Sequence, residues 1–76
     1  MNLNDLPLNT IGIIDELNCN GNIRRRLLDL GLVKGTKITP IFKSPSGEPT
    51  AYEIRRTIIA LRKEDSKLIN LKEDKL

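Results

Sequence analysis

Short apolar runs, several of them alternating with polar positions, recur along this chain and are typical of strands that expose one face to water. Turn-forming residues separate these runs, and no regular alternation of strands with long helices is present, so a parallel sheet is not expected. The pattern predicts a mainly β fold, a small antiparallel barrel of about five short strands. The predicted strands are residues 10–17, 36–43, 49–55, 57–62 and 68–72.

One segment, residues 22–35 (NIRRRLLDLGLVKG), has a helical pattern instead. Ile23, Leu27 and Leu30 recur at i, i+4 and i+7, which places them on one apolar stripe of a two-turn helix. Leu28 lies about 140° from Ile23 around that helix, so it is either a second core contact or an exposed apolar side chain, and we expect core packing. A helix this short is unstable alone, so it should dock on the rest of the domain.

Local residue chemistry sets the expected boundaries of these elements. Asn20 or Asn22 can cap the start of the helix, and Gly31 suits the left-handed residue that follows many helices. Residues 44–47 (SPSG) combine proline at the second position with a terminal glycine, which predicts a β-turn. A turn or a single helical turn is expected at residues 3–7 and 63–66, and a frayed tail at residues 73–76.

Alternation also assigns faces to the strands. In residues 36–43 we expect Ile38 and Phe42 to share one face. Pro40 lacks the N–H that a ladder needs, so this strand is predicted to be an edge strand or to carry a bulge at that point. The same reasoning pairs residues on one face of three other strands: Ile11 with Ile13, Ile59 with Leu61, and Ile69 with Leu71.

Size and composition indicate one small domain over residues 1–76. Twenty-two Leu and Ile residues suffice for a single aliphatic core. A lone cysteine, Cys19, excludes an internal disulfide and fits a reducing compartment. The chain shows no signal peptide and no apolar run near the ~18 residues of a membrane span. We therefore expect a soluble cytosolic protein with no inserted segment.

The charge is mildly basic, +3 from 13 basic and 10 acidic residues. Basic residues cluster at residues 24–26 and at Arg55, Arg56 and Arg62, but acidic residues interrupt them and only one Tyr and one Phe are present. Nucleic-acid binders usually combine a stronger basic excess with aromatic residues for stacking. A solvated basic face is therefore favoured over a nucleic-acid surface.

Residues for catalysis or metal binding are scarce. The chain has no histidine and a single cysteine, so it cannot by itself build a zinc finger, an iron–sulfur site or a thiolate–imidazole dyad. Its glycines lack the strand–loop–helix setting of a phosphate loop. Asp15 and Glu16 would point to opposite faces of a strand. We expect no enzyme activity, no cofactor and no metal site, which leaves binding.

The basic face of the predicted helix is the first candidate surface. Arg24, Arg25 and Lys34 would supply the charge, with Leu28 as an apolar anchor. Arginine is favoured at protein interfaces because its planar fork can pair with a carboxylate at two points. The alternative is that these cations only keep an amphipathic helix soluble.

Three segments together carry a family resemblance: RRLLDLGLVKGTKI at residues 25–38, SPSGEP at 44–49 and YEIRRTIIALRKED at 52–65. Their order and spacing resemble the ferrous iron transport protein A family, FeoA, over residues 3–71. The resemblance implies an SH3-like β-barrel with one inserted short α-helix. It also implies a cytosolic accessory protein of bacterial ferrous iron uptake that acts with the membrane transporter FeoB, which carries a cytoplasmic GTP-binding domain.

Two positions depart from the family pattern. Arg56 stands where the family usually has glycine, so a turn that requires positive φ would strain it by ~1 kcal/mol, and Arg56 could add to the basic surface. Asp65-Ser66 stand where the family commonly has an alanine after the acidic residue, which affects only the last turn.

The resulting hypothesis is an adaptor that binds the cytoplasmic portion of FeoB, at the inner face of the membrane, and modulates iron(II) uptake. The candidate contacts are Arg24, Arg25, Leu28, Lys34 and Arg56. Two alternatives are a nucleic-acid-binding or transcription-regulatory SH3-like module, since this fold also forms the C-terminal domain of iron-dependent repressors, and direct iron carriage by Asp and Glu oxygens. The sequence leaves homo-oligomerisation open.

Overall fold

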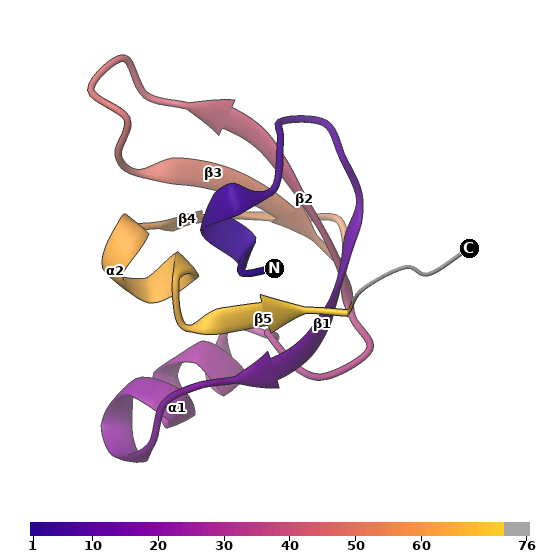
Figure 1. Ribbon diagram of the computed structural model, residues 1–76, viewed down its shortest axis with the longest axis vertical. Coiled ribbons are helices and arrows are strands. Elements are labelled where there is room, and N and C mark those ends of the chain that lie inside the picture. The colour runs from indigo at the N-terminus through magenta and orange to yellow at the C-terminus, as the bar shows by residue number, and fades with distance from the viewer. Residues whose placement is uncertain (73–76) are drawn as a thin grey trace.

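The computed structural model describes residues 1–72, and the predicted frayed tail lies outside them. All five predicted strands, the helix and both single helical turns are present (Figure 1). The elements in chain order are η1 (Leu3–Asp5), β1 (Gly12–Leu17), α1 (Gly21–Asp29), β2 (Lys37–Lys43), β3 (Thr50–Ile54), β4 (Thr57–Leu61), α2 (Lys63–Ser66) and β5 (Ile69–Leu71).

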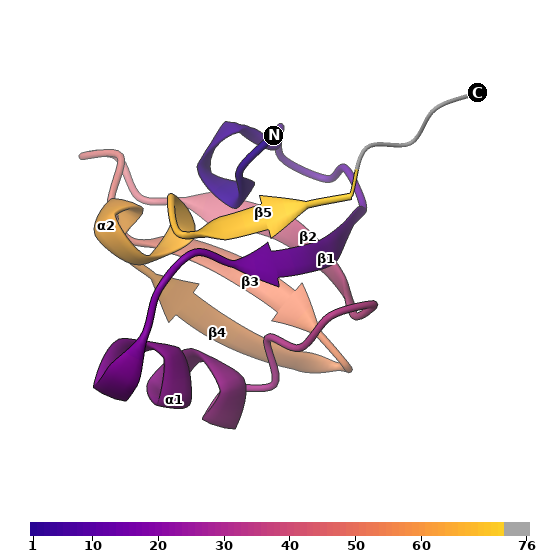
Figure 2. The ribbon, with the colours of Figure 1, turned by 60° about the horizontal axis from the view of Figure 1, so that its bottom comes forward.

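The five strands form one antiparallel sheet in the order β4-β3-β2-β1-β5. β4 and β5 are the two ends of this order, so the barrel is partly open. Figure 2 shows the strands stacked in the curved sheet, with α1 at its margin. The inward side chains make one core of aliphatic residues and a single tyrosine: Leu3, Ile14, Leu17, Leu27, Leu32, Ile38, Tyr52, Ile54, Leu61, Ile69 and Leu71.

α1 reaches this core with one side chain only. Leu27 is fully buried, whereas Ile23 and Leu30 are 46% and 40% exposed. The predicted three-residue stripe is therefore wrong, because α1 lies beside the sheet rather than flat on it (Figure 2). Leu28 is 37% exposed, so its predicted core packing is also wrong, and it is the exposed alternative that holds.

The end of α1 follows the prediction closely. Gly31 has a φ of 96°, and its N–H bonds the Leu28 carbonyl at 2.9 Å while the Leu32 N–H bonds the Leu27 carbonyl at 3.1 Å. These two bonds define a Schellman motif, in which a left-handed residue lets the chain turn back and satisfy helix carbonyls. At the other end Asn20 holds the N-cap position but makes no side-chain capping bond.

β2 shows one confirmed and one wrong prediction. The register with β3 shifts between Pro40 and Phe42, which is the predicted bulge. β2 is not an edge strand, because it pairs with β1 and β3. The bulge also reverses the phase of the strand, so Ile38 is buried while Phe42 is 60% exposed, and the two do not share a face.

The other face assignments hold. Ile59 and Leu61 face the core, as do Ile69 and Leu71. Ile11 and Ile13 share a face too, but it is the outer one, since the buried positions of this segment are Gly12 and Ile14.

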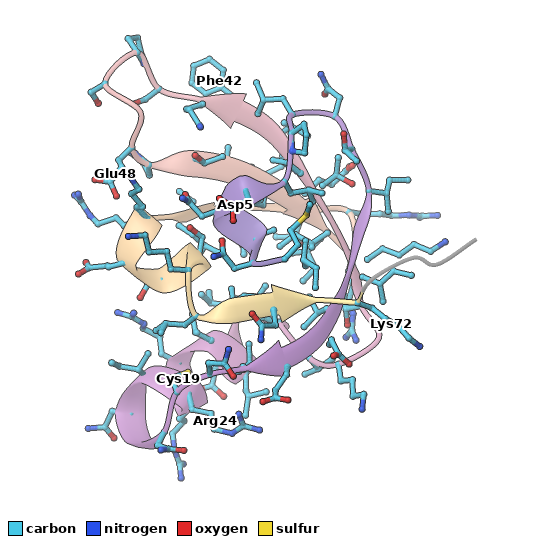
Figure 3. The ribbon with its side chains drawn as sticks, viewed as in Figure 1. Asp5, Cys19, Arg24, Phe42, Glu48 and Lys72 are labelled. Carbon is cyan, nitrogen blue, oxygen red and sulfur yellow. The ribbon has the colours of Figure 1, made fainter. Side chains whose placement is uncertain are left out.

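The β2–β3 loop is closed by a turn and tied to α2. The Gly47 N–H bonds the Ser44 carbonyl at 2.8 Å and Gly47 has a φ of 93°, as predicted for this β-turn. Figure 3 shows Glu48 beside α2. Its Oε1 accepts the Lys63 N–H at 2.6 Å, so a carboxylate from the loop satisfies an orphan donor at the start of α2.

Tyr52 is buried against α2, and its ionisation gives a pH-dependent prediction. Burial raises the pKa of Tyr52 above its ordinary 10.0, and hydrogen bonds with Ser66 and Thr50 oppose that rise. Below about pH 10 the folded and the unfolded chain both keep the phenol proton, so Tyr52 makes its full contribution to the free energy of unfolding. Above that pH the unfolded chain loses the proton first, and stability falls until the folded pKa is passed.

We therefore expect the free energy of unfolding of the wild type to fall more steeply than that of Tyr52→Phe between about pH 9 and 11. Urea titrations at intervals across this range measure both slopes, and the lysines contribute equally to each protein. Equal slopes would contradict the prediction. Tyr52 is the only tyrosine, so its ultraviolet absorbance reports the folded pKa directly.

Candidate functional site

Three of the five predicted contact residues meet in one hollow. Arg24, Leu28 and Lys34 line a space of ≈ 250 Å³ between α1 and β1. Arg24 and Leu28 are one turn apart on α1, and the chain reverses at Gly31 to bring Lys34 back beside them.

Arg25 adjoins this hollow. It lines a second, neighbouring depression together with Arg24 and Leu28. We call Arg24, Arg25, Leu28 and Lys34 the α1 face. This surface combines three cations with one exposed leucine, a mixture of charge and apolar area that protein interfaces use. Three acidic residues, Asp15, Glu16 and Asp29, also line the two hollows.

The cations of the α1 face are held to different degrees. The Arg24 Nη1 donates to the Leu17 carbonyl at 3.2 Å, so this guanidinium is fixed against the end of β1 (Figure 3). The Lys34 Nζ lies 4.0 Å from Asp15 Oδ1, and both are exposed, so this pair contributes little. Within residues 1–72, Arg25 makes no ion pair. Arg25 and Lys34 can therefore turn toward a partner at small cost.

Arg26 has a structural role. Its Nη2 bonds Asp65 Oδ1 at 2.7 Å and ties α1 to α2. Exposed ion pairs contribute only ~0.2–1 kcal/mol, but this pair adds a second attachment for a helix that has one buried residue. Of the three consecutive arginines, only Arg24 and Arg25 border the candidate surface.

Arg56 is not brought to the α1 face. It lies in the two-residue turn between β3 and β4, where Arg55 has a φ of 48° and Arg56 a φ of 66°. Positive φ at both central residues marks a type I′ turn, which normally takes Asn-Gly. The anticipated strain at Arg56 is present, and Arg55 shares it, at ~1–2 kcal/mol per residue.

Arg55 is the residue that the sequence reasoning missed. Its Nη2 donates to the Thr36 Oγ1 at 3.2 Å. It also lines an open hollow with Lys34, Gly35, Thr36 and Lys37. Thr39 pairs with Glu53 across β2 and β3. Thr36 lies three residues before Thr39 and Arg55 two residues after Glu53, so a correct register for this hairpin would have placed the two near each other.

Three features of residues 1–72 bear on other kinds of site. No three His, Cys, Asp or Glu residues of this part gather to hold a metal ion. Cys19 is half-buried and packs against the core. None of the helices in residues 1–72 is long and apolar enough to cross a bilayer.

Known proteins resemble this chain over most of its length. The FeoA domain family matches residues 1–73. A Porphyromonas gingivalis protein, a fusion of Fe(2+) transport protein A with Fe(2+) transporter FeoB, is 31% identical over 71 residues; the match covers 93% of this chain but only 8% of the fusion protein.

Two solved structures show the same fold. The solution structure of iron(II) transport protein A from Clostridium thermocellum has a TM-score of 0.91 and 29% identity, covering 95% of this chain and 44% of that one. The zinc complex of FeoA from Stenotrophomonas maltophilia, described as an SH3 domain protein, has a TM-score of 0.84 and 34% identity, covering 95% and 89%. The SH3-like fold and the family resemblance are thereby confirmed: this chain belongs to the FeoA domain family.

Proposed function

We propose that this chain is a cytoplasmic accessory protein of ferrous iron uptake that binds the cytoplasmic portion of a FeoB transporter through the α1 face and modulates iron(II) transport. The observation that carries this proposal is the P. gingivalis relative, in which the two proteins form one chain. Fusion holds a domain near its neighbour at an effective concentration of about millimolar. The α1 face is the surface that we assign to a contact with this partner.

The surface suits a partner with carboxylates around an apolar recess. Arg25 and Lys34 are exposed, and Leu28 lines one hollow with Arg24 and Lys34 and the other with Arg24 and Arg25. Arginine is enriched among the few residues that carry most of the binding energy in such contacts.

The binding test uses the purified cytoplasmic portion of the FeoB transporter from the same genome. We expect Arg24→Glu/Arg25→Glu/Leu28→Ala to weaken binding by at least about thirtyfold, because it reverses two charges and removes the anchor. Isothermal titration calorimetry measures the affinity, and circular dichroism shows that the variant stays folded.

Two further variants make the result specific. Arg25→Glu/Leu28→Ala leaves the Arg24–Leu17 bond in place, so its loss of binding cannot come from the end of β1. Arg62→Glu/Lys67→Glu reverses two exposed charges near α2 and should bind like the wild type. Unchanged affinity in the folded triple variant would reject the α1 face. Iron(II) uptake by vesicles that contain the transporter, with and without this chain, measures modulation.

A further inference from the structure

A second basic surface shares Lys34 with the hollow between α1 and β1 and continues from there to Lys37 and Arg55. Lys34, Lys37 and Arg55, with Gly35 and Thr36, line an open hollow of ≈ 520 Å³ that we call the basic hollow. None of its lining residues is acidic. The Arg55 guanidinium is held there by its bond to Thr36 Oγ1, which leaves its other N–H groups available. Three cations and no carboxylate line this hollow, so its lining suits an anion.

The backbone beside this hollow is strained. Arg55 and Arg56 both have positive φ in a two-residue turn, where Asn-Gly would fit without strain. Within residues 1–72 neither arginine makes an ion pair that would offset this strain. Strained backbone residues cluster at active sites and ligand-binding sites. The two arginines place charge at this turn at the expense of stability.

Exposed apolar side chains lie next to the same cations. Ile13 pairs with Lys37 across β1 and β2 on the outer face of the sheet, and Ile11 lies on that face two residues earlier. Ile13 is 38% exposed and Ile11 is 64% exposed. The acidic groups near this area are Asp15, 4.0 Å from Lys34, and Glu53 on the outer face of β3. Cations therefore outnumber acids.

We propose that the basic hollow binds the phosphate group of an anionic phospholipid, with Ile11 and Ile13 resting on the bilayer surface. Guanidinium and ammonium groups bind phosphate oxygens by charge-assisted hydrogen bonds. Exposed aliphatic side chains beside cations are the pattern of surfaces that lie at the membrane interface. A free phosphate would use the cations alone and leave the two isoleucines without a role. The basic hollow shares Lys34 with the α1 face. Substitutions at Arg55 and Arg56 leave the α1 face unchanged, so they test lipid binding separately from any contact with the transporter.

Co-sedimentation with vesicles of phosphatidylglycerol and phosphatidylcholine tests the proposal. We expect the wild type to bind these vesicles, to dissociate from them as the salt concentration rises, and not to bind vesicles of pure phosphatidylcholine. Arg55→Asn/Arg56→Gly should bind about 25-fold more weakly, since each cation near an anionic surface strengthens binding about fivefold. This variant should melt no lower than the wild type, because Asn-Gly suits the turn.

Two control variants separate the basic hollow from overall charge. Arg62→Gln/Lys67→Gln removes the same number of charges near α2 and should keep most of the binding. Ile11→Ser keeps every charge and should weaken binding severalfold by loss of apolar contact. Absence of vesicle binding, or equal losses in the Arg55/Arg56 and Arg62/Lys67 variants, would overturn the proposal. A nuclear magnetic resonance response of Lys37 and Arg55 to inorganic phosphate, without vesicle binding, would overturn the lipid assignment.

Discussion

Replacement of Leu27 by alanine should lower the free energy of unfolding by about 2–5 kcal/mol, the range for truncation of a fully buried leucine. Leu27 is the only buried residue of α1, and its carbonyl accepts the Leu32 N–H in the Schellman motif. The side chains of Leu27 and Leu32 are both fully buried in the core. A cavity at this point removes the main attachment of α1 and takes a large share of the stability of so small a domain.

Urea denaturation followed by circular dichroism measures this loss. Leu28→Ala is the matched control, one residue away on the same helix, and should change stability by less than about 1 kcal/mol because Leu28 is exposed. If the two variants lost similar stability, α1 would not be anchored through Leu27. The control also shows whether the Leu28 substitution in the binding test leaves the fold intact.

Valine in place of Gly12 should destabilise the domain by about 1–3 kcal/mol through overpacking. A Cβ at Gly12 would lie 2.9 Å from Leu6 Cδ2 and 2.9 Å from Leu71 Cδ1. These methyl groups can move, so alanine should have a smaller effect than valine. The two extra methyl groups of valine require a larger shift between β1 and β5.

Thermal melting of Gly12→Ala and Gly12→Val tests this order. Ile13→Val is the control, because the neighbouring side chain faces outward and should tolerate the change. Valine favours strands, so a Gly12→Val protein that melted at or above the wild-type temperature would mean that the core has room at this position.

The sequence predicted the elements well because each has a local signal. Gly31 and Gly47 mark chain reversals that favour glycine, and both have positive φ. The prediction of the buried face of α1 was wrong because helical periodicity assumes that the helix lies along the core. α1 flanks the sheet instead, so Ile23 and Leu30 obey the spacing and still face water.

The predicted phase of β2 failed for a different reason. One extra residue between Pro40 and Phe42 changes the register with β3. From the pair Lys43–Thr50, strict alternation along β2 would pair Ile41 with Tyr52, but the bulge pairs Pro40 with Tyr52 instead. Pro40 indicated that a bulge was possible, but the sequence does not distinguish a bulge from an edge strand.

The candidate site was predictable where it is local. Arg24, Arg25 and Leu28 are neighbours on one helix, and the turn at Gly31 returns Lys34 to them. Arg55 was missed because its contact with Thr36 spans 19 residues and depends on the register of the β2–β3 hairpin.

The anchoring of α1 through one buried side chain leaves the rest of the helix open to evolutionary change. Eight of its nine positions contribute no buried side chain, so substitutions there are limited by solubility and helix propensity more than by packing. Members of this family could therefore change the charge and shape of this helix to follow a changing partner, while the strands and Leu27 keep the same barrel. Divergence concentrated on α1 would separate partner choice from folding.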